Sequence, residues 1–159
     1  MYTSLNDAAK NIGNSSYAKG ATRIWYMNEE GWQRCSLGAE FMRKHPELAC
    51  LPTSEADLKR THILLGSIAE KDLNAIYGLM QGEAWSPMGE ARGLISGKGL
   101  HHTSMSVGDV IQIGGSMWMV DRSGFEKLTG NGGGKKRHAA KRPSVGALAA
   151  DLGRMLKKR

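Results

Sequence analysis

Two adjacent histidines, His101 and His102, lie shortly before Asp109 in the stretch "GLHHTSMSVGDV". A histidine beside a carboxylate can take up and release a proton during catalysis, and a nearby hydroxyl can take part in the same transfer. Ser104 and Ser106 supply such hydroxyls between the histidines and the aspartate. These residue types would suit an acid–base group.

The spacing of these residues argues against catalysis. Adjacent side chains on an extended chain point to opposite faces, so only one of the two histidines could address a given site. Asp109 ends a turn-like segment, where its carboxylate more usefully accepts hydrogen bonds from the local backbone. The chain also lacks helical His-x-x-x-His, Cys-x-x-Cys, nucleophile-elbow and phosphate-loop motifs. We therefore expect no catalytic residue, no metal site and no cofactor, and we interpret the histidines as the lead-in to a β-strand.

The first half of the chain predicts short elements. Residues 24–27 and 32–37 are expected to form a hairpin around a turn at residues 28–31. A short helix follows and is ended by Pro46, and residues 50–60 are expected to be a polar connection. Residues 61–65 predict a short strand. Ser67 and Glu70 have capping-box spacing ahead of a helical stripe made by Leu73, Ile76, Tyr77 and Met80.

The second half of the folded part predicts a β-hairpin. A turn at residues 106–109 leads into the strand "VIQI", the pair Gly114 and Gly115 suits a tight hairpin, and "SMWMV" returns before a further turn. Met117 and Met119 should face one side of the sheet, and Trp118 and Val120 the other. The fold class is therefore α+β: a small, mostly antiparallel sheet with one well-formed helix.

The stretch "HTSMSVGDVIQIGGSMWMVDRSGFEKL" resembles the C-terminal signature of YodL-like domains. In that family a serine-rich turn and an Asp-Val-Ile run precede a hairpin, and a Gly-Phe pair closes the motif. The resemblance covers residues 61–128. It implies the setting of accessory proteins of mobile genetic elements such as plasmids and integrative elements, near genes that counter host defence, and it implies no particular activity.

The basic charge of the chain is confined to its C-terminal end. Residues 1–129 hold 13 Lys and Arg against 14 Asp and Glu, whereas residues 130–159 hold 9 against 1, which together give the net charge of +7. We expect three parts: a compact α+β domain over residues 1–129, a flexible Gly/Lys-rich linker over residues 130–143, and a basic amphipathic helix over residues 144–159.

Two sets of candidate binding residues follow from this division. The residues expected to contact nucleic acid are basic: Lys135, Lys136, Arg137, Lys141, Arg142, Lys157, Lys158 and Arg159. The residues expected to contact a protein partner are apolar and comprise the helical stripe and one tryptophan in a turn-rich stretch: Leu148, Leu152, Met155, Leu156 and Trp85.

The remaining aromatic and cysteine residues are expected to be structural. Buried free cysteines are common, so Cys35 and Cys50 are interpreted as core residues of a reduced, cytoplasmic protein without a transmembrane segment. The tryptophans are expected in the core or at an interface. A base-stacking surface that uses Trp25 and Trp32, which have arginines nearby, is the alternative.

Two classes of function fit these expectations. The first is a non-enzymatic protein that binds and inhibits or modulates a host defence nucleoprotein complex, with an anti-CRISPR inhibitor as its most specific version. The second is a plasmid-type nucleic-acid-binding accessory or regulatory protein. The slightly acidic body favours the first class, because a dedicated DNA reader more often carries positive charge on its folded face.

Overall fold

A five-stranded antiparallel sheet organises the part of the chain described by the computed structural model, which comprises residues 2–5, 7–8, 19–48 and 51–128. The order of the strands is β2-β1-β3-β4-β5, and every neighbouring pair is antiparallel. The α+β class with an antiparallel sheet is therefore confirmed. The strands are β1 Thr22–Met27, β2 His62–Ile68, β3 Val110–Ile113, β4 Ser116–Asp121 and β5 Gly124–Leu128.

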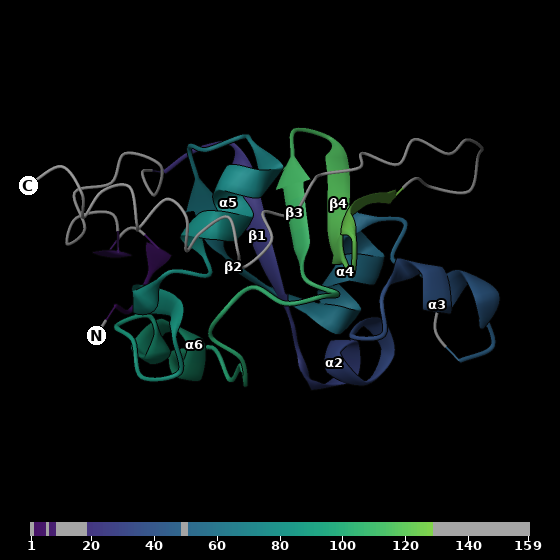
Figure 1. The fold of residues 1–159 in the computed structure, drawn as a ribbon, viewed down its shortest axis with the longest axis horizontal. Helices are drawn as coiled ribbons and strands as arrows, with labels where there is room; N and C mark the ends of the chain where they lie inside the picture. The colour runs from purple at the N-terminus through teal and green to yellow at the C-terminus, as the bar shows by residue number, and fades with distance from the viewer. Residues whose placement is uncertain (1, 6, 9–18, 49–50, 129–159) are drawn as a thin grey trace, which may run out of the picture.

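Several short helices cover this sheet, where the sequence predicted one well-formed helix. In Figure 1, α2, α3 and α4 gather on one side of β1, and α5 and α6 lie on the other. None of the described helices is long and apolar enough to cross a membrane. The helices are α2 Glu29–Cys35, α3 Ala39–Lys44, α4 Glu55–Thr61, α5 Leu73–Leu79 and α6 Arg92–Gly97, and Glu83–Trp85 forms a 3-10 turn.

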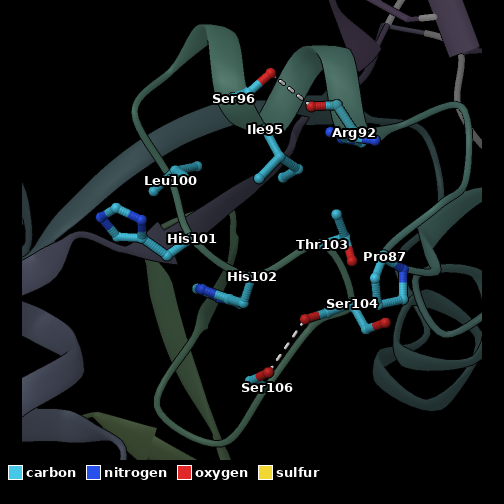
Figure 2. A pocket seen from close by; sticks show the side chains of 10 residues that line it. All are labelled: Pro87, Arg92, Ile95, Ser96, Leu100, His101, His102, Thr103, Ser104 and Ser106. Atoms are coloured by element: carbon cyan, nitrogen blue, oxygen red, sulfur yellow. Dashed lines mark hydrogen bonds between the residues drawn. The ribbon is translucent and has the colours of Figure 1, made fainter.

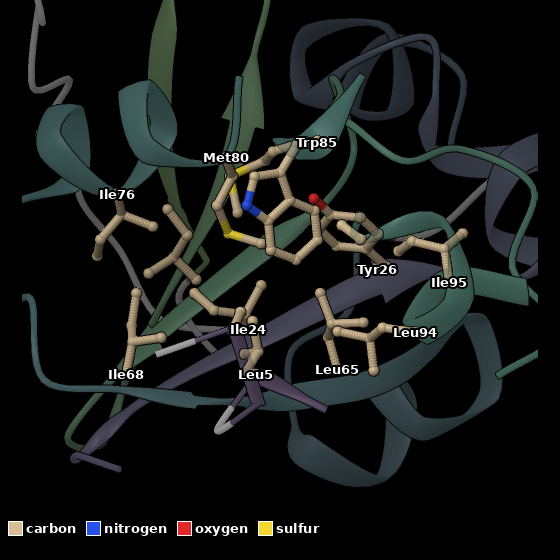
Figure 3. Close-up of a cluster of buried hydrophobic side chains, with 14 of the residues drawn as sticks. Leu5, Ile24, Tyr26, Leu65, Ile68, Ile76, Met80, Trp85, Leu94 and Ile95 are labelled. Carbon is tan, nitrogen blue, oxygen red and sulfur yellow. The ribbon is translucent and has the colours of Figure 1, made fainter. Parts of the chain in front are cut away.

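Both faces of the sheet are buried, and the strand alternation assigns side chains to each face. On β1, Ile24 and Tyr26 belong to a cluster shared with α5, α6 and the 3-10 turn, part of which is drawn in Figure 3. Trp25 and Met27 belong to a second cluster shared with α2, α3 and α4. The sheet therefore lies between two layers of helices, each packed on one of its faces.

The predicted first hairpin is wrong, because the chain turns from β1 into a helix. Asn28 is the N-cap of α2, and its side chain accepts a hydrogen bond from the Gly31 N–H at 2.8 Å. A Cβ at Gly31 would lie 2.0 Å from the backbone oxygen of Thr61, so the close packing of α2 on the end of α4 requires glycine there. The antiparallel partner of β1 is instead β2.

Two further expectations in this half are wrong. The predicted polar connection contains α4, which Ser54 caps by accepting a hydrogen bond from the Asp57 N–H at 3.1 Å. The predicted capping box fails because Ser67 lies in β2, and Asp72 caps α5 instead. The apolar stripe itself is confirmed: Ile76 and Met80 are buried in the core, and Leu73 and Tyr77 pack against it.

The C-terminal half follows the prediction closely. The strands β3 and β4 and the glycine turn between them lie where the sequence placed them. The segment after β4 was predicted only to turn, and the structure adds the strand β5 there, paired with β4. Met117 and Met119 pack with the α2–α4 cluster, and Val120 and Trp118 with the other cluster, so the predicted division of faces is confirmed. The linker predicted at residues 130–143 and the helix predicted at residues 144–159 lie outside the described residues.

Replacement of Trp118 by alanine should lower the free energy of unfolding by about 1–2 kcal/mol, less than the loss expected for a fully buried ring. Trp118 is only half-buried, and the Lys127 ammonium group lies 5.5 Å from the centre of its ring. Chemical denaturation should measure this loss, with Trp85→Ala as the more damaging control. A loss as large as that of Trp85→Ala would contradict the half-buried position.

Candidate functional site

The carboxylate of Asp109 is fully buried at the start of β3 and connects three parts of the chain. It accepts hydrogen bonds from the Met27 N–H at 2.9 Å and from the Ser106 N–H at 2.7 Å. His102 Nε2 lies 2.9 Å and 3.0 Å from the two carboxylate oxygens. The predicted local bonding of Asp109 to the backbone is confirmed through Ser106, and the pairing with His102 and the end of β1 is added by the fold.

His102 also makes aromatic contacts. Its ring stacks on Tyr26 with centres 4.8 Å apart and planes 12° apart, and Trp32 lies against it at 5.2 Å. Because a carboxylate only accepts hydrogen bonds, Nε2 carries a proton, and Nδ1 presents a lone pair in the neutral imidazole. No described residue forms a hydrogen bond with Nδ1, and 11% of the His102 side chain is exposed.

An open pocket of about 530 Å³ lies beside His102 (Figure 2). It is bounded by α6, by the loop that leads to β3 and by the segment after the 3-10 turn. Its walls mix basic, hydroxyl and apolar side chains, which are Pro87, Arg92, Ile95, Ser96, Leu100, His101, His102, Thr103, Ser104 and Ser106. Both histidines that the sequence singled out therefore line one pocket, with His101 exposed and His102 mostly buried.

The hydroxyl groups near His102 do not form a nucleophile–base pair with it. Ser104 Oγ donates to the backbone oxygen of Trp85 at 2.9 Å, and Ser106 Oγ donates to the backbone oxygen of Ser104 at 3.1 Å. A serine nucleophile needs its hydroxyl hydrogen-bonded to the base that will remove the proton. The arrangement therefore fits a binding pocket better than a catalytic triad.

A second histidine contacts the same turn and was missed from the sequence. His62, at the start of β2, is buried and its Nε2 lies 2.9 Å from the backbone oxygen of Gly108, while its Nδ1 lies 2.8 Å from Thr61 Oγ1. Gly108 has a φ of +101°, and a Cβ there would meet Met27 Sδ at 2.4 Å. No local motif marks His62, because its contact with Gly108 joins residues 46 positions apart.

Burial lowers the pKa of His62 below its ordinary value of 6.5. The unfolded chain therefore takes up this proton at a higher pH than the folded protein does, so the His62 contribution to stability falls as the pH drops below about 6.5. We expect the free energy of unfolding to decrease by up to about 1.4 kcal/mol per pH unit from this group within that window.

Urea denaturation at a series of pH values from neutral to mildly acidic should show this dependence. His62→Gln should flatten the dependence, and the exposed His101→Gln should leave it unchanged. The same pH dependence in all three proteins would show that another group causes it.

Trp85, predicted to contact a partner, is instead a core residue. It is 1% exposed and packs beside Met80 and Tyr26, with the two aromatic ring centres 6.3 Å apart (Figure 3). The turn-rich sequence around Trp85 suggested exposure, but the 3-10 turn and α6 fold its ring onto the sheet. The other candidate binding residues, at positions 135–159, lie outside the described residues.

Trp25 and Cys35 take structural positions in the core, whereas Trp32 lies at the surface. Trp25 is 2% exposed and its indole N–H donates to Gln112 at 3.0 Å, so it is unavailable for base stacking, whereas Trp32 is 47% exposed. Burial raises the pKa of the Cys35 thiol to about 11, which keeps it protonated and unreactive. The predicted core position of Cys35 is confirmed, and Cys50 lies outside the described residues.

Within the described ranges, no group of three or more His, Cys, Asp and Glu side chains is placed to hold a metal ion. No protein-family profile, no curated protein and no solved structure matches the chain. The resemblance of residues 61–128 to YodL-like domains therefore stays a prediction.

Proposed function

We propose that the protein is a non-enzymatic, cytoplasmic product of a mobile genetic element that binds and inhibits or modulates a host defence nucleoprotein complex. A CRISPR effector is the most specific form of that partner. In this proposal the body contacts a protein surface, and the basic residues 130–159 contact nucleic acid or the channel that holds it. The resemblance to YodL-like domains supports the mobile-element setting.

The observation that carries the proposal is the separation of charge along the chain. Residues 130–159 hold 9 basic residues against 1 acidic residue. In the body, five basic side chains form ion pairs with neighbouring carboxylates, so positive charge is less concentrated there than in residues 130–159. The pairs are Arg23–Glu55, Arg34–Glu30, Arg43–Glu126, Lys44–Glu40 and Lys59–Glu55.

Exposed apolar side chains on the body support contact with a protein. Among the residues that the structure describes, most large apolar side chains are buried, but Trp32 is 47% exposed and Met88 is 83% exposed, together with Leu37 and Leu48. Tryptophan and methionine are enriched in protein interfaces, where they bury large areas. With Trp85 in the core, Trp32 and Met88 replace it as the proposed contacts of the body, beside Leu148, Leu152, Met155 and Leu156 in the C-terminal segment.

The second candidate is a nucleic-acid-binding accessory or regulatory protein of a plasmid type. The observation that favours it is the same basic segment, because clustered lysines and arginines bind phosphates without sequence preference. This function would need no protein contact by Trp32 or Met88, and the two candidates therefore differ in a way that can be measured.

Affinity capture from a bacterial lysate that contains a defined CRISPR effector should separate the two functions. Capture with the full chain, before and after nuclease treatment, should retain the effector in both cases if a protein surface is recognised. If the protein binds nucleic acid only, the effector should no longer be captured after nuclease treatment. A Trp32→Ala, Met88→Ala variant is the matched control, and it should weaken capture of the effector but leave binding to bulk nucleic acid unchanged.

A further inference from the structure

The pocket beside His102 is not used by the proposed function, and its polar groups divide into two kinds. One kind can only accept hydrogen bonds. The hydroxyl protons of Ser96, Ser104 and Ser106 are each donated to a backbone oxygen, so these side chains offer lone pairs to anything in the pocket. In the neutral imidazole, His102 Nδ1 also presents a lone pair, because Nε2–H faces Asp109.

The other kind supplies hydrogen-bond donors and positive charge. Arg92 lines the pocket, and no described carboxylate forms an ion pair with its guanidinium group. His101 and Thr103 add an imidazole and a hydroxyl, for which no hydrogen bond within the described residues competes. None of the ten lining residues is an aspartate or a glutamate. An arginine without a carboxylate partner favours an anionic group, and its fork of N–H donors suits phosphate best.

Apolar side chains complete the wall. Pro87, Ile95 and Leu100 line the pocket, and Figure 2 shows Ile95 and Leu100 on one side of the space and Pro87 on another. The volume of about 530 Å³ lies in the range of pockets that hold small organic ligands, about 300–1,000 Å³. A suitable ligand therefore carries an anionic group, several hydrogen-bond donors and a flat apolar body.

We propose that this pocket binds a nucleoside monophosphate, either free or as the phosphorylated end of a strand. Its phosphate would meet the Arg92 guanidinium group, and its sugar hydroxyls or base amine would donate to the serine oxygens and His102 Nδ1. Its base would pack on Pro87, the exposed apolar residue of the wall, and touch only the small exposed parts of Ile95 and Leu100. The buried Asp109 carboxylate fixes the tautomer and orientation of the His102 ring. His102 Nδ1 is therefore already in place as a hydrogen-bond acceptor before the ligand binds.

Titration calorimetry on the full chain with adenosine 5′-monophosphate, adenosine and inorganic phosphate tests this proposal. The nucleotide should bind at least tenfold more tightly than either fragment, because only the nucleotide uses both kinds of polar group and the apolar wall. Arg92→Gln should weaken nucleotide binding about tenfold, the cost of one charge-assisted contact to phosphate. Equal affinity for phosphate and nucleotide would overturn the proposal.

The matched control is Arg122→Gln, which removes another exposed arginine, in the turn between β4 and β5. Arg122→Gln should leave nucleotide binding unchanged, and an equal loss in both variants would show that only net charge matters. Amide NMR shifts should localise the ligand to residues 92–106. Shifts confined to residues 130–159 would also overturn the proposal.

The two sources of the nucleotide can be separated with the same protein. A short single-stranded oligonucleotide with a 5′-phosphate should compete with adenosine 5′-monophosphate, and the same strand without the phosphate should compete at least tenfold less well, if the pocket takes the end of a strand. If both strands compete equally poorly while the nucleotide still binds, the pocket takes a free nucleotide.

Discussion

Replacement of Asp109 by alanine should lower the free energy of unfolding by about 3–5 kcal/mol, one of the largest effects expected in the body of the protein. The carboxylate is fully buried, and the substitution leaves the N–H groups of Met27 and Ser106 without their acceptor. Each buried N–H left unsatisfied costs about 1–3 kcal/mol. His102 Nε2 loses its partner as well.

Chemical denaturation followed by circular dichroism should measure this loss. Glu29→Ala removes an exposed carboxylate from the first turn of α2 and should change stability by less than about 0.5–1 kcal/mol. Asp109→Asn should lie between the two, because the amide keeps one acceptor oxygen but offers donors where the carboxylate accepted. An Asp109→Ala protein as stable as the native protein would mean that the turn does not depend on the carboxylate.

The sequence predicted the elements whose apolar pattern is strong and local. The strands β3 and β4 alternate between the two buried faces and are separated by a glycine pair, so periodicity and turn chemistry agree on their positions. The apolar stripe of α5 was found for the same reason. These elements need no knowledge of the rest of the fold to be recognised.

The helices that the sequence missed have weak periodicity. Leu58 is the only residue of α4 buried in the core, so no stripe marks that helix, although Ser54 and Asp57 have the spacing of a capping motif. In α2, Trp32 is a good strand former and Asn28 is a good turn former, and both favoured a hairpin. The segment forms the helix α2 instead, in which Gly31 packs against the backbone of Thr61. That contact joins residues that are distant in the sequence.

The candidate site could be predicted only in part for a similar reason. The bond from Asp109 to the Ser106 backbone is local and was expected. The bond from Asp109 to Met27 joins residues 82 positions apart, and His102 reaches the carboxylate only because its loop folds back onto Tyr26. The burial of Trp85 likewise depends on the sheet beneath it. The residue types in the sequence were enough to single out the candidate site residues, but only the tertiary structure determines which of them contact one another.

The largest effect on nucleic-acid binding is expected from the basic cluster of the C-terminal segment. Neutralisation of Lys135, Lys136, Arg137, Lys141 and Arg142 to glutamine removes five of the 9 basic residues in positions 130–159. The logarithm of the binding constant falls linearly with the logarithm of the salt concentration, and each phosphate contact on duplex DNA contributes about 0.9 to the steepness of this salt slope. If all five residues contact phosphates, the slope of the variant should therefore be shallower by about 4.5. Between about 50 and about 200 mM salt, the native protein should therefore lose about 500-fold more affinity than the variant.

Fluorescence anisotropy with a duplex oligonucleotide, measured across this salt range, should give both slopes. A second variant, in which Leu148, Leu152 and Leu156 are replaced by serine, is the matched control because it spares every charge. Its affinity for DNA and its salt slope should be those of the native protein. Equal slopes in the native and neutralised proteins would show that the basic cluster makes no phosphate contact.

Capture of the defence complex by the same two variants shows whether the C-terminal segment contacts phosphates only or also binds a protein as a helix. If residues 144–159 bind a protein groove as an amphipathic helix, loss of the leucine stripe should weaken capture of the nuclease-treated complex at least as much as loss of the five charges. If the segment contacts phosphates only, the leucine variant should capture the complex nearly as well as the native protein does. We expect both variants to weaken capture and the leucine variant to do so more strongly. Full capture by the leucine variant would eliminate the proposed protein contact of this segment and leave the nucleic-acid-binding function as the better account.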